Sequence, residues 1–338
     1  MTPLLEVRDV TKEYVGGGLF GRHKTVALAN FSLAFSGERP TVLAIAGESG
    51  SGKTTLARLI LGFISPTQGQ VLYQGKPLQS MSRAELMQFR REVQAVYQDP
   101  FEVYNPYYKV DRLLTTPIAK FGLANSRAEA QEMVERALQG VGLRPEETLG
   151  RYPHQLSGGQ RQRITIARAL LLNPRILVAD EPVSMVDASL RATILESLLK
   201  LNEEFGISLF YITHDLATAY QLCEDIIILY QGCVAEVGDV ELVIQDPQHP
   251  YTQLLISSVP HADPDLQWGW ARDRGEDGGG THSGRGCKFA ERCPRLMDVC
   301  RDIAPPLFRT NGSRATACHL YADSPATEAT DVLTGSPR

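Results

Sequence analysis

The segment Gly47-Glu48-Ser49-Gly50-Ser51-Gly52-Lys53-Thr54 fits the pattern G-x-x-x-x-G-K-[ST] of a phosphate-binding loop. The glycines let the backbone close in, so that successive N–H groups can surround anionic oxygens. In this pattern the lysine reaches the terminal phosphates and the hydroxyl of the last residue binds Mg²⁺. The predicted nucleotide contacts are Gly47, Glu48, Ser49, Gly50, Ser51, Gly52, Lys53, Thr54 and Thr55.

Two adjacent carboxylates, Asp180 and Glu181, follow the apolar run 176–179. Carboxylates at the C-terminal edge of such a strand face the crevice in which α/β sheets bind ligands. We expect Asp180 to hold Mg²⁺ through water and Glu181 to polarise the attacking water as a general base. In a chain without a phosphate loop, the same pair would more simply be a helix cap and a solvated acid.

The elements that would position these groups alternate between strands and helices. The short apolar run 41–46 leads into the loop, and residues 53–63 carry apolar side chains at helical spacing behind it. Further apolar, β-branched runs predict buried parallel strands at residues 176–179, 208–213 and 226–230. The sequence therefore predicts an α/β core.

A more helical stretch separates the two halves of this core. The capping-box patterns Ser82-x-x-Glu85 and Ser126-x-x-Glu129 predict two helix starts. Residues 156–172 indicate a helix that begins at glycines and ends before Pro174.

Composition excludes several classes of protein. The chain has 338 residues, 22% of them charged, and a formal net charge of −5, which disfavours a general nucleic-acid binder. The first residues mix charged with apolar side chains, unlike a secretory signal. No apolar run approaches the roughly 18 residues that a spanning helix needs. We therefore expect any membrane role to come through a partner.

The segment Leu156-Ser157-Gly158-Gly159-Gln160 follows the phosphate loop by about a hundred residues and resembles the signature of ATP-binding cassette (ABC) proteins. The resemblance implies an ABC-type nucleotide-binding domain with a RecA-like P-loop core and a helical subdomain. It also implies that Ser157, Gly158, Gly159 and Gln160 contact the ATP held by a second, identical or homologous subunit. A glycine-rich helix start is itself an anion site. A head-to-tail dimer follows.

The resemblance implies roles for further residues. His214 would contact the γ-phosphate, Gln98 would ligate Mg²⁺ and sense a transmembrane partner, and Tyr14 would stack on adenine. Without the resemblance, these would be a structural histidine, a turn residue and an exposed strand tyrosine. Residues 184–187 match the loop that crosses the dimer interface, although Met185 and Val186 stand where the family more often has Ala-Leu.

Other segments resemble the ATPases of dipeptide and oligopeptide importers. They are Gln98-Asp99-Pro100 with Asn105-Pro106, Asp180-Glu181-Pro182-Val183-Ser184, and His249-Pro250-Tyr251-Thr252 with Leu254-Leu255 and Ser258-Val259-Pro260. The resemblance implies an ATPase, peripheral on the cytoplasmic face of the cell (inner) membrane, that powers peptide import. Its partners would be two permease subunits and an extracytoplasmic solute-binding protein, with no nucleic acid. Tyr107 and Tyr108 would lie near the permeases, unless they are packing aromatics.

Alternative functions stay open at this point. Nickel chelates, glutathione or another small solute could replace peptides as the cargo. A non-transport ABC ATPase of DNA repair or translation is a different class. Repair ATPases separate the two motifs by a long coiled coil and translation factors carry two cassettes, and the sequence has neither feature.

A change in composition near Asp246 predicts a domain boundary. We expect an ATPase domain at 1–245, with its helical subdomain at about 100–172, and a small cysteine-bearing extension at 246–325. Residues 326–338 have few large apolar side chains and are predicted to be disordered.

Four cysteines in the extension follow the spacing C-x5-C-x6-C-x17-C. This spacing lacks the close pairs of structural zinc sites but gathers four thiols in a loop-rich segment. With the resemblance, it leads us to expect a structural [4Fe-4S] cluster. Zinc, with His282 or His319 as further ligands, and free thiols are the alternatives. The expected ligands are Cys287, Cys293, Cys300 and Cys318; Cys223 and Cys233 fall in the α/β core.

Overall fold

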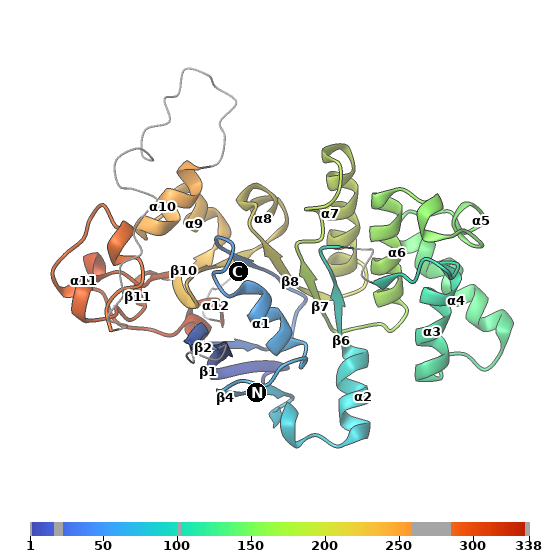
Figure 1. Ribbon diagram of the computed structural model, residues 1–338, viewed down its shortest axis with the longest axis horizontal. Coiled ribbons are helices and arrows are strands. Elements are labelled where there is room, and N and C mark those ends of the chain that lie inside the picture. The colour runs from blue at the N-terminus through green and yellow to red at the C-terminus, as the bar shows by residue number, and fades with distance from the viewer. Residues whose placement is uncertain (1, 17–22, 100–102, 259–284, 335–338) are drawn as a thin grey trace. The chain divides into compact units, whose positions relative to one another are not determined.

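The computed structural model describes residues 2–16, 23–99, 103–258 and 285–334 (Figure 1). The chain forms two compact units. The first comprises residues 1–36, 43–79 and 213–338, and the second comprises residues 37–42 and 80–212. Several residues singled out in the sequence lie outside the described residues. They are Pro100, Val259, Pro260, His282 and residues 335–338.

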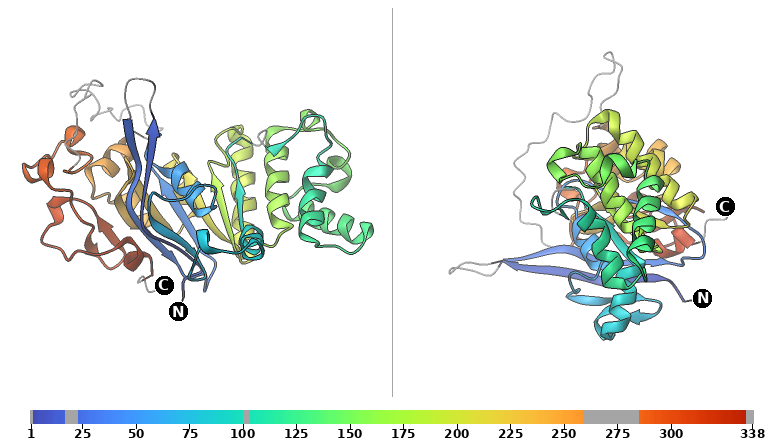
Figure 2. Two further views of the ribbon diagram at one scale, coloured as in Figure 1. Left: turned by 60° about the horizontal axis from the view of Figure 1, so that its bottom comes forward. Right: turned by 90° about the vertical axis from the view of Figure 1, so that its right-hand side faces the viewer.

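The first unit contains an antiparallel sheet of four strands in the order β2-β1-β4-β5. Strands β1 and β2 pair along their whole length, from Leu5 opposite Phe35 to Gly16 opposite His23, and form a long hairpin (Figure 2). Leu5, Val7 and Val10 of β1 are buried. The strands are β1 (Leu5–Gly16), β2 (His23–Phe35), β4 (Gln68–Tyr73) and β5 (Lys76–Pro77).

The same unit holds five strands in the order β11-β12-β10-β9-β3. Only β3 and β9 pair in parallel, and the other neighbours are antiparallel. These strands are β3 (Val42–Ala46), β9 (Asp225–Tyr230), β10 (Cys233–Asp239), β11 (Phe308–Asn311) and β12 (Arg314–Thr316). The helices are α1 (Lys53–Ile60), α8 (Leu216–Leu222), α9 (Val240–Gln245), α10 (Pro250–Ser257), α11 (Val299–Asp302) and α12 (Ala329–Thr334), with short 3-10 turns η1 (Leu78–Ser80), η4 (Ala290–Arg292) and η5 (His319–Tyr321).

The second unit has three parallel strands in the order β8-β7-β6, which are buried almost throughout. They are β6 (Val93–Val96), β7 (Ile176–Asp180) and β8 (Ser208–Thr213). Its helices are α2 (Arg83–Glu92), α3 (Asp111–Phe121), α4 (Arg127–Gly140), α5 (Pro145–Thr148), α6 (Gly158–Leu170) and α7 (Ala188–Glu203), with the 3-10 turn η3 (Pro153–Gln155). The prediction of an α/β class is confirmed, with antiparallel and mixed pairing in addition to the parallel strands.

The two predicted capping boxes differ in the structure. At α2 the box is complete, because the Ser82 N–H donates to the Glu85 carboxylate at 2.8 Å and the Glu85 N–H donates to Ser82 Oγ at 3.3 Å. At α4, Ser126 Oγ accepts from the Glu129 N–H, but the Glu129 carboxylate accepts from the Asn125 N–H instead. The second box is therefore only half formed.

The last part of the chain departs from two expectations. The predicted disorder of residues 326–338 is wrong for residues 329–334, which form α12. Ala329 and Val332 are buried, and Thr330 Oγ1 accepts a hydrogen bond from the Ala34 N–H at 3.1 Å. Two apolar residues spaced about one helical turn apart can therefore anchor a segment whose composition is polar.

A separate cysteine-bearing extension is likewise not confirmed. Strand β12 pairs with β10 in antiparallel register, with Glu236 opposite Thr316 and Gly238 opposite Arg314. The boundary expected near Asp246 therefore falls inside the first unit. Within the described residues, no helix has both the length and the apolar character needed to cross a membrane.

Candidate functional site

The phosphate loop joins β3 to α1 in the first unit and has a backbone that only glycine can adopt at two positions. Gly47 has a φ of +147°, and a Cβ there would lie 2.2 Å from the Leu229 carbonyl oxygen. Gly52 has a φ of +107°, and its Cβ would lie 2.5 Å from the Ala27 carbonyl oxygen. These close approaches hold the loop tightly against neighbouring backbone, as a phosphate cradle requires.

Lys53 and Ser51 direct polar atoms into this loop. The Lys53 side chain is buried, and its Nζ donates to the carbonyl oxygens of Gly47 at 2.6 Å and Glu48 at 2.9 Å. Ser51 Oγ is buried without a hydrogen-bond partner among the described residues. A buried ammonium and an unsatisfied hydroxyl in a glycine-built loop fit a bound phosphate group. Thr54, in the first turn of α1, carries a hydroxyl of the kind that binds Mg²⁺ beside such a loop.

In the second unit, Asp180 ends β7 and Glu181 follows it with a positive φ of 46°. This conformation is costly for a non-glycine residue. The Glu181 N–H donates to the Ile212 carbonyl at 2.8 Å, and its own carbonyl accepts from Ser184 Oγ at 2.9 Å. Hydrogen bonds on both sides of Glu181 therefore hold its backbone in a strained conformation, as is common at functional sites.

The signature residues begin α6 and cap it. The Ser157 N–H donates to Gln160 Oε1 at 2.9 Å, and the Gln160 N–H donates to Ser157 Oγ at 3.2 Å. Gly159 has a second, structural role, because a Cβ there would lie 2.9 Å from Leu190 Cδ1 of α7. Gly159 therefore permits close packing of α6 on α7, a role that the sequence analysis missed.

Three further predicted site residues lie at or near the surface of their units. Gln98 is exposed after β6, and His214 is exposed between β8 and α8. Tyr14 of β1 has a side chain 40% exposed, with Lys12 Nζ 5.4 Å from its ring centre. Tyr14, His214 and the phosphate loop belong to the first unit, whereas Gln98, Asp180, Glu181 and the signature belong to the second.

The tyrosines near Asn105 divide into packed and exposed side chains. The Tyr104 hydroxyl donates to the Arg161 carbonyl at 3.0 Å, and burial raises its pKa. Tyr107 is 86% exposed, and Tyr108 lies under the guanidinium of Arg112, whose Cζ is 4.0 Å from the ring centre.

Comparisons with known proteins agree with this geometry. Residues 30–184 match the family "ABC transporter", and residues 235–300 match "Oligopeptide/dipeptide transporter, C-terminal region". The di/tripeptide transport ATP-binding protein DppF of Pseudomonas aeruginosa is 39% identical over 320 residues, which cover 94% of this chain and 98% of that protein. The chain belongs to the ATP-binding proteins of peptide-type ABC transporters.

Solved structures of the ABC family share the fold. The ATP-binding cassette MJ0796, in a dimeric post-hydrolysis state with ADP and Pi, matches with a TM-score of 0.61 and 32% identity, covering 70% of this chain and 98% of that one. The protein cbiO1 from Clostridium perfringens, part of the ABC transporter complex cbiONQ, matches with a TM-score of 0.61 and 26% identity, covering 73% and 92%.

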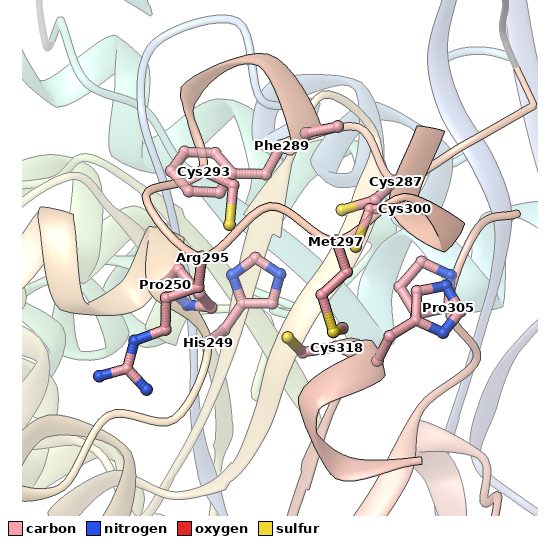
Figure 3. A pocket seen from close by; sticks show the side chains of 12 residues that line it. His249, Pro250, Cys287, Phe289, Cys293, Arg295, Met297, Cys300, Pro305 and Cys318 are labelled. Atoms are coloured by element: carbon pink, nitrogen blue, oxygen red, sulfur yellow. The ribbon is translucent and has the colours of Figure 1, made fainter. Parts of the chain in front are cut away.

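The four cysteines 287, 293, 300 and 318 line one small pocket together with His249 and Met297 (Figure 3). The prediction of a [4Fe-4S] cluster here is wrong. Among the described residues, which include all four cysteines, no group of three or more His, Cys, Asp or Glu side chains is arranged to hold a metal ion. Within the described part of the chain, which contains His319 but not His282, the alternative of zinc fails on the same finding.

Two physical features explain why thiols can share a pocket without a metal centre. The cavity volume of about 10 Å³ accommodates one water molecule at most, far less than a cube of four irons and four sulfurs. Burial raises the pKa of Cys287 and Cys293, and that of Cys318 to about 11, so these side chains are neutral thiols at neutral pH. Here the cysteines act as small apolar side chains.

Residues from the C-terminal part of the chain reach the phosphate loop, which sequence reasoning missed. The Glu48 N–H donates to the Tyr251 hydroxyl oxygen at 2.8 Å. Arg292 forms two hydrogen bonds with the Glu48 carboxylate, at 2.8 and 2.9 Å. Tyr251 belongs to the segment that carries the peptide-importer resemblance, but the sequence contains nothing that connects it with Glu48.

Proposed function

We propose that this chain is the ATP-hydrolysing subunit of a membrane transporter that imports peptides. One observation carries the proposal: a glycine-built phosphate loop and the region matched by the oligopeptide/dipeptide transporter family lie in one compact unit. Peptides are preferred to nickel chelates or glutathione as the cargo because the family that matches this region is described as an oligopeptide/dipeptide transporter. In this proposal residues 1–245 are the ATPase part and residues 246–325 the transporter-specific part.

The residues of the loop would bind the triphosphate, with Lys53 on the terminal phosphates and Tyr14 on the adenine. Mg²⁺ would be held by Thr54, Gln98 and Asp180, and when bound it neutralises phosphate charge. His214 would orient the γ-phosphate. Glu181 would accept a proton from the water that attacks the γ-phosphorus, while the bond to the ADP oxygen breaks.

A second ATPase subunit would complete each site. Ser157, Gly158, Gly159 and Gln160 lie at the start of α6, a helix of 13 residues whose N-terminus favours an anion. The dimeric state of the MJ0796 cassette supports this arrangement. Permease subunits would contact the exposed Tyr107, and a solute-binding protein would deliver the cargo on the far side. The proposed location is peripheral, on the cytoplasmic face of the inner membrane.

Replacing the general base tests the catalytic assignment. Glu181→Gln keeps the size of the side chain but removes the proton acceptor, so we expect ATP binding to persist while turnover falls by about 10²–10⁴-fold. ATPase activity should be measured on the assembled transporter, with Glu204→Gln at the exposed end of α7 as the matched control. Turnover within a few fold of wild type in Glu181→Gln would remove Glu181 from the role.

The transport assignment has a separate test. Tyr107→Ala removes the most exposed of the described aromatic side chains near Asn105, and we expect weaker co-purification with membrane permeases while ATP affinity is unchanged. Unchanged co-purification would exclude Tyr107 from the contact. Purification of the native chain without any permease would contradict the transporter role itself.

A further inference from the structure

Glu48 places a carboxylate inside the phosphate loop, directly after Gly47. A like charge close to a polyphosphate opposes its binding unless something neutralises that charge. Lys53, the cation of the loop, donates to the backbone carbonyls of Gly47 and Glu48. The Glu48 side chain instead pairs with a residue 244 positions further along the chain.

Arg292, at the end of η4, makes that ion pair with both of its terminal nitrogens. Nη1 donates to Glu48 Oε2 at 2.8 Å and Nη2 donates to Oε1 at 2.9 Å. Two parallel hydrogen bonds fix the orientation of both groups as well as their distance. The guanidinium Cζ also lies 5.8 Å from the Tyr230 ring centre and 5.7 Å from that of Phe289, so that aromatic rings support it from the side.

Tyr251 holds the backbone of the same residue. Its hydroxyl accepts the Glu48 N–H at 2.8 Å, and its ring is fully buried. The ring centre lies 4.5 Å from that of Tyr230 and 5.5 Å from that of Phe289, in the aromatic cluster that also supports Arg292. Both the main chain and the side chain of Glu48 are therefore fixed by residues beyond position 245.

We propose that Arg292 and Tyr251 are positioning residues of the nucleotide site, through which the C-terminal part of the chain sets the affinity of the phosphate loop for ATP. Arg292 neutralises Glu48, so that the loop presents net positive charge to the phosphates. Tyr251 orients the Glu48 peptide unit at the start of the loop. This inference rests on the proposed ATP-binding function of residues 47–55.

A double-mutant cycle in the full-length chain tests the electrostatic part, with the dissociation constant for a fluorescent ATP analogue as the measurement. The pair is partly exposed, with side chains 46% and 37% accessible, so its effect is modest. We expect Arg292→Ala to weaken binding about three- to tenfold. In a Glu48→Gln background the same change should alter binding by less than about twofold, because no carboxylate is left to neutralise.

Two further variants sharpen the result. Arg292→Lys keeps the charge and should recover part of the affinity, and Tyr251→Phe, which removes only the hydroxyl, should weaken binding about two- to fivefold. Arg301→Ala, an exposed arginine of α11, removes the same charge away from the loop and is the matched control. Thermal unfolding without nucleotide identifies variants that lose structure.

The outcomes separate the inference from the function on which it rests. If wild-type protein binds ATP but Arg292→Ala weakens binding equally in the wild-type and Glu48→Gln backgrounds, or not at all, the inference is overturned and the function stands. If wild-type protein fails to bind ATP, and Lys53→Ala changes nothing, both are overturned. Coupling between the two substitutions, with binding by Arg301→Ala unchanged, supports the inference.

Discussion

The phosphate loop and the cysteine pocket differ in what holds their shape. In the loop the backbone holds the shape. Gly47 and Gly52 have positive φ angles and lie so close to backbone carbonyl oxygens that a Cβ would clash with them. In the pocket, packing holds the shape, because side chains such as His249, Phe289 and Met297 fill the space around four thiols. At these two glycines the phosphate loop cannot accept an added methyl group, whereas the cysteine pocket is sensitive to the polarity of the side chains buried in it.

The largest expected effect comes from adding one methyl group to the loop. In Gly47→Ala the new Cβ would meet the Leu229 carbonyl oxygen at 2.2 Å, so the loop must shift and ATP binding should be lost. Gly150→Ala, outside the loop, is the matched control, because its Cβ has no neighbour within 4 Å and its positive φ of 77° costs about 1–2 kcal/mol. Calorimetric titration with ATP compares the two. Equal losses of affinity would mean that the close approach at Gly47 does not matter.

The next effect concerns pH and two buried groups, Glu236 and His249. Burial raises the pKa of Glu236 to about 7 and lowers the pKa of His249 to about 4. The stability that Glu236 contributes is full below its unfolded pKa and is lost as pH rises towards 7; that of His249 is full above 6.5 and is lost as pH falls towards 4. Between about pH 4.5 and 6.5 the two trends oppose each other.

Glu236→Gln should leave His249 as the main source of the pH dependence of stability in this range. Gln248 and His249 donate their N–H groups to the Glu236 carboxylate at 3.0 and 2.9 Å, and the amide oxygen of glutamine can still accept one of them. The free energy of unfolding of this variant should rise by about 1–3 kcal/mol between pH 4.5 and 6.5, more steeply than in wild type. Urea titrations at several pH values measure this. A slope identical to that of wild type would show that the two groups do not titrate as their burial implies.

The smallest expected effect is in the pocket itself. Cys300→Ser replaces a buried thiol by a hydroxyl and should lower the free energy of unfolding by about 1–2 kcal/mol, while ATP binding is kept. Cys293→Ser, at a more accessible position, should cost less. Thermal melts of both variants, beside ATP titrations, give the comparison. Loss of ATP binding in Cys300→Ser would show that the pocket and the loop are coupled more closely than packing implies.

Sequence reasoning succeeded where consecutive residues determine the geometry. The strands at 176–179, 208–213 and 226–230 and the complete capping box at Ser82 are read from local patterns, and the structure contains them. The half-formed box at Ser126 shows the limit of such patterns, because Glu129 has a competing N–H donor at Asn125. A local pattern specifies which groups are near each other, but not which of two equivalent partners is chosen.

Reasoning failed where residues meet across long separations. The spacing of the cysteines indicated four metal ligands, but spacing over loops does not fix how buried the thiols are or how much room lies between them. Helix α12 was not predicted because its two buried residues, Ala329 and Val332, stand among polar residues and make a weak apolar pattern. Arg292 and Glu48 are 244 positions apart, and no local pattern around either residue indicates that they meet in the folded chain.

The antiparallel pairing of β12 with β10 has a practical consequence for anyone who dissects this protein. A fragment that ends at residue 245 would leave the outer hydrogen-bonding groups of β10 without their strand partner. Unpaired strand edges are templates for association between chains. Such a fragment would also lack Ala315 and Val332, which are buried in the full chain. We therefore expect a minimal nucleotide-binding fragment to aggregate, and a version prepared for crystallography or interaction studies should retain the chain at least to residue 334.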